Sequence, residues 1–412
     1  MSAATYKWCV VGMLWLVCFF NYADRQSIFS VFPLLRADLR LSDLELGIAG
    51  ASFMWVYALF GPVAGWLGDR FSRKRLILGA LVFWSLATAS TALAQNLWQL
   101  TLCRALGGLG EAFYFPASMS LIGDYHALST RSRAMALHQS SVYVGTIAGG
   151  VCSGWLAERY GWRPMFGCFG FLGIALALLL CGLLREPVRG MSEEKPAAVP
   201  ARAAQPIVTV IGDLLANRLV ALLILAFIGA NFVAVVFLTW MPSYLYRTFG
   251  MNLSMAGWNA TAYLQTASVL GVFTGGVLAD WLSRRRRGAR ALTQSVGLVC
   301  GIPFLFLTGH TRAVPVLVVA MACFGYFKGL YDANIFASLY DVVDVEVRAA
   351  AAGLINSLGW LGGGFAPIVV AAASARFGMS ACLSATSAVY LCCALLLAVA
   401  ARACRVGPSS PW

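Results

Sequence analysis

Long apolar segments alternate with short charged or glycine- and proline-containing stretches along almost the whole chain. Most of these segments approach the ~20 residues that a helix needs to cross a hydrocarbon core about 30 Å thick. They are continuous, whereas the strands of a transmembrane barrel show short alternating segments. The pattern predicts an all-α membrane protein with twelve transmembrane helices, near residues 8–35, 44–68, 76–94, 98–125, 132–157, 165–184, 218–246, 254–281, 291–308, 313–340, 349–373 and 380–401.

The composition excludes an ordinary soluble protein. Apolar residues make up 60% of the 412 residues and charged residues only 11%, whereas a globular domain carries roughly 25% charged residues. The net charge of +13 belongs to no basic soluble domain or arm, so we expect no binding to nucleic acid. The 12 cysteines lie in or beside apolar runs without metal-ligand spacing, as is typical of small hydrophobic residues.

One long polar stretch divides the chain into nearly equal parts. We expect a six-helix bundle over residues 1–184, a cytoplasmic linker over 185–217, a second six-helix bundle over 218–401 and a cytoplasmic tail over 402–412. Most lysine and arginine residues fall on one side if both termini are cytoplasmic, which is the orientation that the positive-inside rule favours. The first apolar segment has no cleavage site and is expected to be a retained span of a multi-pass cell (inner or plasma) membrane protein.

A loop motif occurs once in each part of the chain. The sequence GWLGDRFSRKR at residues 65–75 returns as GVLADWLSRRR at residues 276–286. This motif resembles the loop after the second helix in the major facilitator superfamily, with Ser72 in place of the second glycine of the family pattern. The resemblance covers nearly the whole chain and implies two pseudo-symmetric six-helix halves with a transport site between them.

The repeated loop also predicts a cytoplasmic gate. Asp69 and Asp280 end the second helix of each half, where their carboxylates can pair with Arg73 and Arg284 and hold the halves in one of two arrangements. The alternative for the two arginines is simple anchoring at lipid head groups, because basic residues alone set topology.

Ionisable residues inside spans cost roughly 2.5–3.5 kcal/mol each on insertion scales, so each needs a partner or a function. The formal charges of this set cancel, which favours a shared polar cavity over static contacts between helices. The set consists of Asp24, Arg25, Arg104, Glu111, Lys328 and Asp332.

Three segments carry a closer resemblance, to the anion:cation symporter branch. They are the Asn-Tyr-Ala-Asp-Arg sequence at residues 21–25, the Arg104 and Glu111 pair, and the Trp-Met-Pro-Ser-Tyr-Leu sequence at residues 240–245. The resemblance implies that Asp24 and Glu111 carry protons, that Arg104 couples them, and that Arg25 binds a substrate carboxylate.

Further positions match that branch less closely. The resemblance places Tyr22, Tyr57 and Asn356 around the substrate, and packing or hydrogen bonding between helices is an equal alternative. Lys328 and Asp332 lie one turn apart and can pair locally, or Lys328 can contact an anionic head group. His138 is a candidate for proton relay or for a hydrogen-bonded cavity residue.

The same first and fourth helices also resemble the Spinster branch of lysolipid carriers, through Gly-Glu-Ala at residues 110–112 and Arg-Ser-Arg at residues 131–133. The fold and the coupling residues are therefore expected to be shared, and the cargo stays open. Helix 5 lacks the Gly-Pro element typical of drug–proton antiporters, and paired charges would block the open pore of a channel.

The sequence thus predicts a proton-coupled secondary transporter that moves an organic anion, such as a sugar acid, by alternating access. The absence of a G-x4-G-K-[ST] motif indicates that an ion gradient supplies the energy. No metal-spaced cluster or nucleophile motif indicates an enzyme. We expect no cofactor and no metal, and as partners an anionic or amphiphilic small molecule, protons and the lipid bilayer, with the protein as a monomer.

Overall fold

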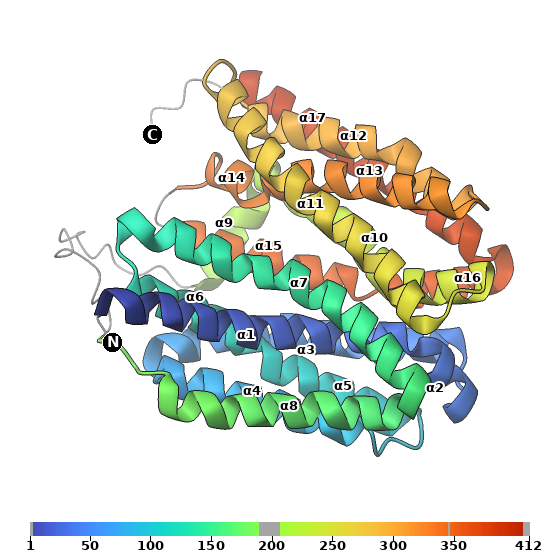
Figure 1. Ribbon diagram of the computed structural model, residues 1–412. Helices are drawn as coiled ribbons and strands as arrows, with labels where there is room; N and C mark the ends of the chain where they lie inside the picture. Colours follow the sequence, from blue (N-terminus) through green and yellow to red (C-terminus); the bar gives the residue numbers. More distant parts are fainter. Residues whose placement is uncertain (1–2, 189–206, 345–346, 407–412) are drawn as a thin grey trace. The chain divides into compact units, whose positions relative to one another are not determined.

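The computed structural model describes residues 3–188, 207–344 and 347–406, and within these ranges every regular element is a helix (Figure 1). The helices are α1 (Ala3–Ser30), α2 (Phe32–Leu39), α3 (Asp43–Arg70), α4 (Arg73–Thr91), α5 (Leu97–Ala112), α6 (Tyr114–Tyr125), α7 (Leu128–Tyr160), α8 (Trp162–Leu183), α9 (Ile207–Ala216), α10 (Arg218–Phe249), α11 (Leu253–Ser283), α12 (Ala289–His310), α13 (Val314–Asp332), α14 (Ile335–Tyr340), α15 (Arg348–Gly363), α16 (Ala366–Phe377) and α17 (Met379–Val406).

Two compact units divide the chain. Unit 1 consists of Met1–Arg202 together with Leu245–Trp258, and unit 2 consists of Ala203–Tyr244 and Asn259–Trp412. Helices α10 and α11 therefore begin or end in unit 1 and run for most of their length in unit 2.

Several predicted spans are broken helices. The predicted span 98–125 is interrupted at Phe113, and Pro116 in the first turn of α6 has no backbone N–H with which to continue the α5 ladder. The same reason applies to Pro367 at the start of α16. The break between α13 and α14 has no proline, and the Asn334 side chain there donates to the Leu330 carbonyl at 3.2 Å.

The predicted linker also contains a helix that was not predicted. Helix α9 forms within the range 185–217 and contacts α15 of unit 2. Residues 189–206 of the predicted linker, and residues 407–412 of the predicted tail, lie outside the part of the chain that the structure describes.

Nine segments of the described chain are long and apolar enough to cross a membrane. They contain α1, α3, α8, α10, α11, α12, α13 with α14, α15 with α16, and α17. Helix α4, the broken pair α5 and α6, and helix α7 do not belong to this set. These three segments hold more polar side chains, or are interrupted, and α5 supplies two residues to the charged cluster of unit 1.

Helices α1 and α7 approach each other closely because glycine leaves no side chain between them. A Cβ on Gly145 would lie 2.5 Å from the Phe19 carbonyl oxygen, and one on Gly149 would lie 2.4 Å from the Ala23 carbonyl oxygen. Both distances are far below van der Waals contact, so small residues permit this packing. The contact fixes the half of α1 that carries Asp24 and Arg25.

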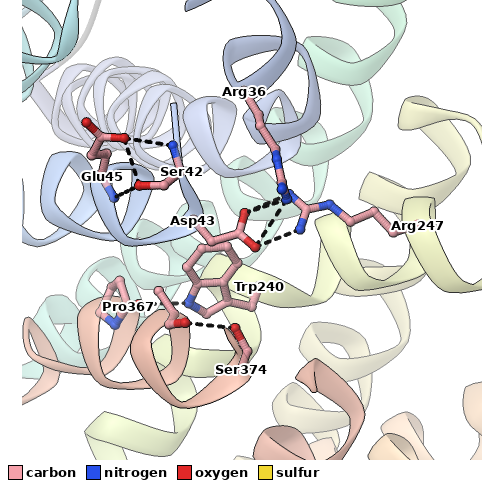
Figure 2. Close-up of polar contacts among 9 residues, drawn as sticks. Arg36, Ser42, Asp43, Glu45, Trp240, Arg247, Pro367 and Ser374 are labelled. Carbon is pink, nitrogen blue, oxygen red and sulfur yellow. Dashed lines mark hydrogen bonds and ion pairs between the residues drawn. The ribbon is translucent and has the colours of Figure 1, made fainter. Parts of the chain in front are cut away.

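The first turn of α3 is stabilised by a capping box and an ion cluster (Figure 2). Ser42 accepts from the Glu45 backbone N–H, and the Glu45 carboxylate accepts from the Ser42 N–H at 2.8 Å, so two free helix donors are satisfied. Asp43 lies between two arginines, at 3.1 Å from Arg36 Nη1 and 2.9 Å from Arg247 Nη2. This cluster holds the Leu245–Trp258 segment of unit 1 against the start of α3.

Candidate functional site

Four of the charged residues predicted inside spans converge in unit 1. Asp24 and Arg25 come from α1, and Arg104 and Glu111 come from α5. All four are buried, with exposed fractions of 4%, 7%, 2% and 1% respectively. Burial of this kind is tolerated only when the charges compensate one another, and here two guanidinium groups accompany two carboxylates.

Arg25 and Glu111 form the direct ion pair of this cluster. The Arg25 Nε and Nη2 donate to the same carboxylate oxygen, Glu111 Oε2, at 3.0 and 2.7 Å. Arg25 Nη2 also lies 3.4 Å from the Asn21 side-chain oxygen. Glu111 Oε1 is buried and has no hydrogen-bond partner in the described chain, so the carboxylate is only half satisfied.

Aromatic rings surround the Arg25 guanidinium. Its central carbon lies 4.7 Å from the Tyr22 ring centroid, 4.9 Å from that of Phe53 and 4.7 Å from that of Tyr57. Ring faces attract a cation and leave its edge open for hydrogen bonds. Tyr22 and Tyr57, both predicted near the substrate, therefore lie beside the arginine predicted to bind it, and Phe53 joins them without having been predicted.

Arg104 lies on the same Phe53 ring. Its guanidinium carbon is 4.7 Å from the Phe53 centroid. Its Nε and Nη2 are buried without a hydrogen-bond partner among the described residues. Glu111 therefore pairs with Arg25, the residue predicted to bind substrate, and its direct partner is not Arg104, the residue predicted to couple the two carboxyl groups.

The fourth member, Asp24, faces α4. Its Oδ2 accepts a hydrogen bond from the Thr88 hydroxyl, and its Oδ1 is buried without a hydrogen-bond partner in the described part of the chain. Thr88 joins the candidate site without having been predicted, because a threonine in an apolar helix carries no distinguishing signal.

His138 lies in the core of unit 1. It is fully buried, and its Nε2 is 2.8 Å from the Tyr114 hydroxyl. The single hydroxyl proton of Tyr114 is donated to the Leu14 carbonyl at 2.6 Å, so His138 Nε2 must be the donor to the Tyr114 oxygen. This arrangement is that of a hydrogen-bonded core histidine joining α7 to α6 and α1.

Two of the candidate residues of unit 2 are paired with each other. Lys328 and Asp332 form an ion pair one helical turn apart at the end of α13, the simpler of the two interpretations open for them. Asn356 is partly buried in α15. Trp240, in the segment that resembles the symporter branch, is fully buried and donates to the Pro367 carbonyl at 3.2 Å (Figure 2).

One of the two residues predicted for a gate in unit 1, Arg73, lies at the capped start of α4. Arg73 forms an ion pair with Asp124 at the end of α6. The Glu186 carboxylate accepts from the backbone N–H groups of Arg73 and Lys74, at 2.9 and 2.7 Å, and thereby caps α4. Asp69 is in the last turn of α3, and its side chain lies outside the described part of the structure.

In unit 2 the pairing differs from the prediction. Asp280 lies 3.1 Å from Arg290 Nη2, and Arg290 Nη1 lies 2.5 Å from Asp341. The predicted partner Arg284 stands exposed just after the end of α11, whereas Arg290 is in the first turn of α12 and reaches both carboxylates. An arginine at the start of α4 or α12 thus pairs with an aspartate at the end of α6 or α14 in each unit.

Long apolar helices that enclose a buried ion pair define the class of a polytopic membrane protein. The chain belongs to the Major Facilitator Superfamily, whose sequence profile matches residues 14–367 and 244–410. The predicted family is therefore confirmed, as is the all-α fold. Within the described residues, no group of three or more His, Cys, Asp or Glu side chains is placed to hold a metal ion.

Relatives of known or assigned cargo cover most of the chain. The probable galactarate/D-glucarate transporter GudP of Escherichia coli is 25% identical over 389 residues, which are 88% of this chain and 86% of that protein. The hexuronate transporter of Bacillus subtilis is 26% identical over 357 residues, 85% of this chain and 83% of that protein. These relatives are transporters, and the chain is not an enzyme.

The fold also matches a solved structure closely. A bacterial homologue of the human lysosomal transporter Spinster, in an inward-facing and unoccupied conformation, gives a TM-score of 0.87 at 23% identity and covers 98% of this chain and 99% of that one. At this identity the likeness concerns the fold.

Proposed function

We propose that this chain is a proton-coupled secondary transporter of small organic anions, with sugar acids as the first class to test. The observation that carries the proposal is the Arg25–Glu111 ion pair, buried among three aromatic rings in unit 1. The names of the relatives, which include galactarate, glucarate and hexuronate transporters, support the choice of anion class.

The ion pair suggests how a proton and an anion are linked. A substrate carboxylate and the Glu111 carboxylate compete for the same donors of Arg25. Protonation of Glu111 removes its negative charge. A substrate carboxylate can then take its place and neutralise the buried Arg25 guanidinium. Proton binding and anion binding thereby favour each other, as the reciprocity of linked equilibria requires.

Arg104 supports a substrate with more than one acceptor group. Arg25 and Arg104 contact one Phe53 ring at 4.9 and 4.7 Å, so two guanidinium groups share one small volume. The two unpartnered buried donors of Arg104 favour an additional oxygen ligand, because a hydrogen bond to a charged group contributes about 1.5–3 kcal/mol. A sugar diacid offers both a second carboxylate and hydroxyl oxygens.

The remaining features of the proposal follow the sequence. The protein has twelve transmembrane helices in two six-helix halves, residues 1–184 and 218–401, joined by the linker 185–217 and followed by the tail 402–412. Both termini are cytoplasmic, the membrane is the cell membrane, and the monomer is the working unit. Asp24 takes part in proton binding, and Asn356, Lys328 and Asp332 are the candidate substrate residues of unit 2.

The repeated loops provide the proposed cytoplasmic gate. In unit 1 the ion pair of Arg73 and Asp124 holds α4 against α6, and in unit 2 the pairs of Arg290 hold α12 against Asp280 and Asp341. These contacts, with Asp69 and Arg284 nearby in sequence, rearrange when the cytoplasmic side opens.

A substrate panel in proteoliposomes tests the function. Galactarate, glucuronate and lysophosphatidylcholine are compared as cargo under an imposed pH gradient, inside acidic or outside acidic. We expect saturable uptake of the sugar acids with the outside acidic, and its loss in Arg25→Ala, while the exposed control Arg159→Ala transports normally. Transport of the lysolipid alone would establish the Spinster-like alternative, and flux that does not saturate would indicate a channel.

A further inference from the structure

A small cavity lies beside Asp24, on the side of α1 that faces α4 and α8. Its walls combine three aromatic rings with three polar side chains: Phe20, Trp84 and Phe169, with Asp24, Ser85 and Thr88, and Gly173 closing it on α8. It has room for about one water molecule. A dry cavity in a protein is lined by apolar groups, whereas a cavity of this size with several polar partners holds water.

The hydrogen bonds of Asp24 leave one oxygen for such a ligand. Oδ2 accepts from the Thr88 hydroxyl, and Oδ1 is buried with no hydrogen-bond partner among the described residues. Asp24 is 4% exposed, Ser85 2% and Thr88 4%. An oxygen of a buried carboxylate that lacks a donor carries a desolvation cost, and a water molecule in this cavity would remove it.

The cavity exists because α8 has glycine where it crosses α4. A Cβ on Gly173 would lie 2.1 Å from the Ser85 hydroxyl oxygen, and one on Gly170 would lie 2.6 Å from the Ser85 carbonyl oxygen. Any larger residue at position 173 would displace the Ser85 hydroxyl. Gly167, nearly two turns earlier on the same helix, has open space around it. A side chain at position 167 would therefore not disturb Ser85, which makes this glycine a matched control.

We propose that this cavity binds one water molecule between Asp24 Oδ1 and the hydroxyls of Ser85 and Thr88, and that the last proton transfer to Asp24 passes through it. In the forward step an O–H bond of a hydronium in the cavity breaks, a new O–H bond forms on Oδ1, and water and a neutral carboxylic acid remain. The reverse step returns the proton to the same water. The inference rests on the proposed proton coupling and adds Ser85 and Thr88 as positioning residues.

The charged groups that face Asp24 favour water over a metal cation. Arg104 on α5 and Arg25 on α1 act electrostatically on the Asp24 carboxylate, and so does the Glu111 carboxylate on α5, which is itself paired with Arg25. The lining from α4 and α8 contains no charged residue. A sodium ion would meet two guanidinium charges and too few oxygen ligands. A neutral water molecule meets neither objection and needs only two to four hydrogen-bond partners.

Infrared difference spectra of the full-length protein in lipid nanodiscs, recorded between acidic and alkaline buffer, test the inference without any substrate. We expect a carboxylic C=O band that Asp24→Asn abolishes. Ser85→Ala should shift this band, because the water molecule that bonds the protonated Oδ1 loses one of its partners, and Gly173→Ala should do the same by pushing the Ser85 hydroxyl away. The matched controls are Thr91→Val, whose hydroxyl bonds the Ala87 carbonyl on the same helix, and Gly167→Ala.

Each outcome decides between the two proposals. A band that is lost in Asp24→Asn but unmoved in Ser85→Ala and Gly173→Ala overturns the water site and leaves proton binding at Asp24 intact. If no band depends on Asp24, proton binding there fails and the water site fails with it. In proteoliposomes, Ser85→Ala and Thr88→Val should lower gradient-driven uptake by roughly tenfold, the effect of one ordinary hydrogen bond, while counterflow exchange stays near that of Thr91→Val.

Discussion

The coupling free energy between Arg25 and Glu111 can be measured by a double-mutant cycle on the free energy of unfolding. Glu111→Leu leaves the Arg25 cation buried, and Arg25 cannot lose its charge at any accessible pH. Removing one partner of a buried pair costs about 3–5 kcal/mol. Three rings within 5 Å of the guanidinium retain some attraction, each worth about 0.5–2 kcal/mol, so we expect a cost near the lower limit, about 3 kcal/mol.

The double variant should recover most of this loss. Arg25→Met with Glu111→Leu replaces both charges by apolar side chains, and such replacements are often neutral. The coupling energy of the cycle should therefore be at least about 3 kcal/mol, because the cost of Arg25→Met alone adds to that of Glu111→Leu. It is measured from the free energies of unfolding in mixed micelles.

An exposed ion pair of the same unit provides the matched control. Arg163 and Asp38 pair through side chains that are 39% and 49% exposed, and such pairs typically contribute 0.2–1 kcal/mol. If the changes in the free energy of unfolding for Arg25→Met and Glu111→Leu instead add to within about 0.5 kcal/mol in the double variant, the two residues behave as independent sites. The two charges then do not compensate each other, and the proposed replacement of Glu111 by a substrate carboxylate at Arg25 is refuted.

Three further variants test other parts of the structure. Arg104→Gln should weaken binding of a sugar diacid by at least about tenfold, because a charge-assisted bond is lost, whereas Arg159→Gln should not, as calorimetry would show. Gly149→Val should destabilise by about 1–3 kcal/mol or more, since its Cβ would meet the Ala23 carbonyl at 2.4 Å, while Gly167→Val leaves the melting temperature nearly unchanged. Burial lowers the pKa of His126, so the unfolded chain binds the proton first, stability falls as the pH drops below about 6.5, and His126→Gln should flatten that fall.

The apolar pattern predicts where helices run, and it cannot predict where they break without proline. Pro116 and Pro367 give a visible reason for two interruptions. The break before α14 depends on the Asn334 amide, which bonds the Leu330 carbonyl and also the Gly275 carbonyl of another helix at 3.3 Å. That contact is tertiary and leaves no local signal.

The charged residues of the site are recognisable because burial of charge is costly, but their pairing is not. Glu111 meets Arg25 rather than Arg104 because of how α5 is rotated against α3. A Cβ on Gly108 would lie 2.3 Å from the Phe53 carbonyl oxygen, so this glycine face of α5 packs on α3 and directs Arg104 to the Phe53 ring. Spacing along one helix cannot reveal that rotation.

The repeat predicts the wrong ion-pair partner for Asp280 for a similar reason. Alignment of the two loops makes Arg284 the counterpart of Arg73, yet Arg290 forms the ion pairs in unit 2. The second loop is longer before its helix begins, with α12 starting at Ala289 after Gly288 in a left-handed conformation. The geometric counterpart is therefore the arginine in the first turn of the next helix.

The most direct test of proton coupling is uptake by Glu111→Gln in proteoliposomes, with the anion that the substrate panel identifies. The amide still accepts a hydrogen bond from Arg25 but cannot carry a proton or a charge. Gradient-driven uptake should fall to background, counterflow exchange should continue, and anion binding should depend much less on pH, with Asp24 as the remaining proton site, while the exposed control Asp213→Asn behaves as the unaltered protein. Driven uptake at the unaltered rate in Glu111→Gln would contradict the role of this carboxylate as the competitor that a proton removes.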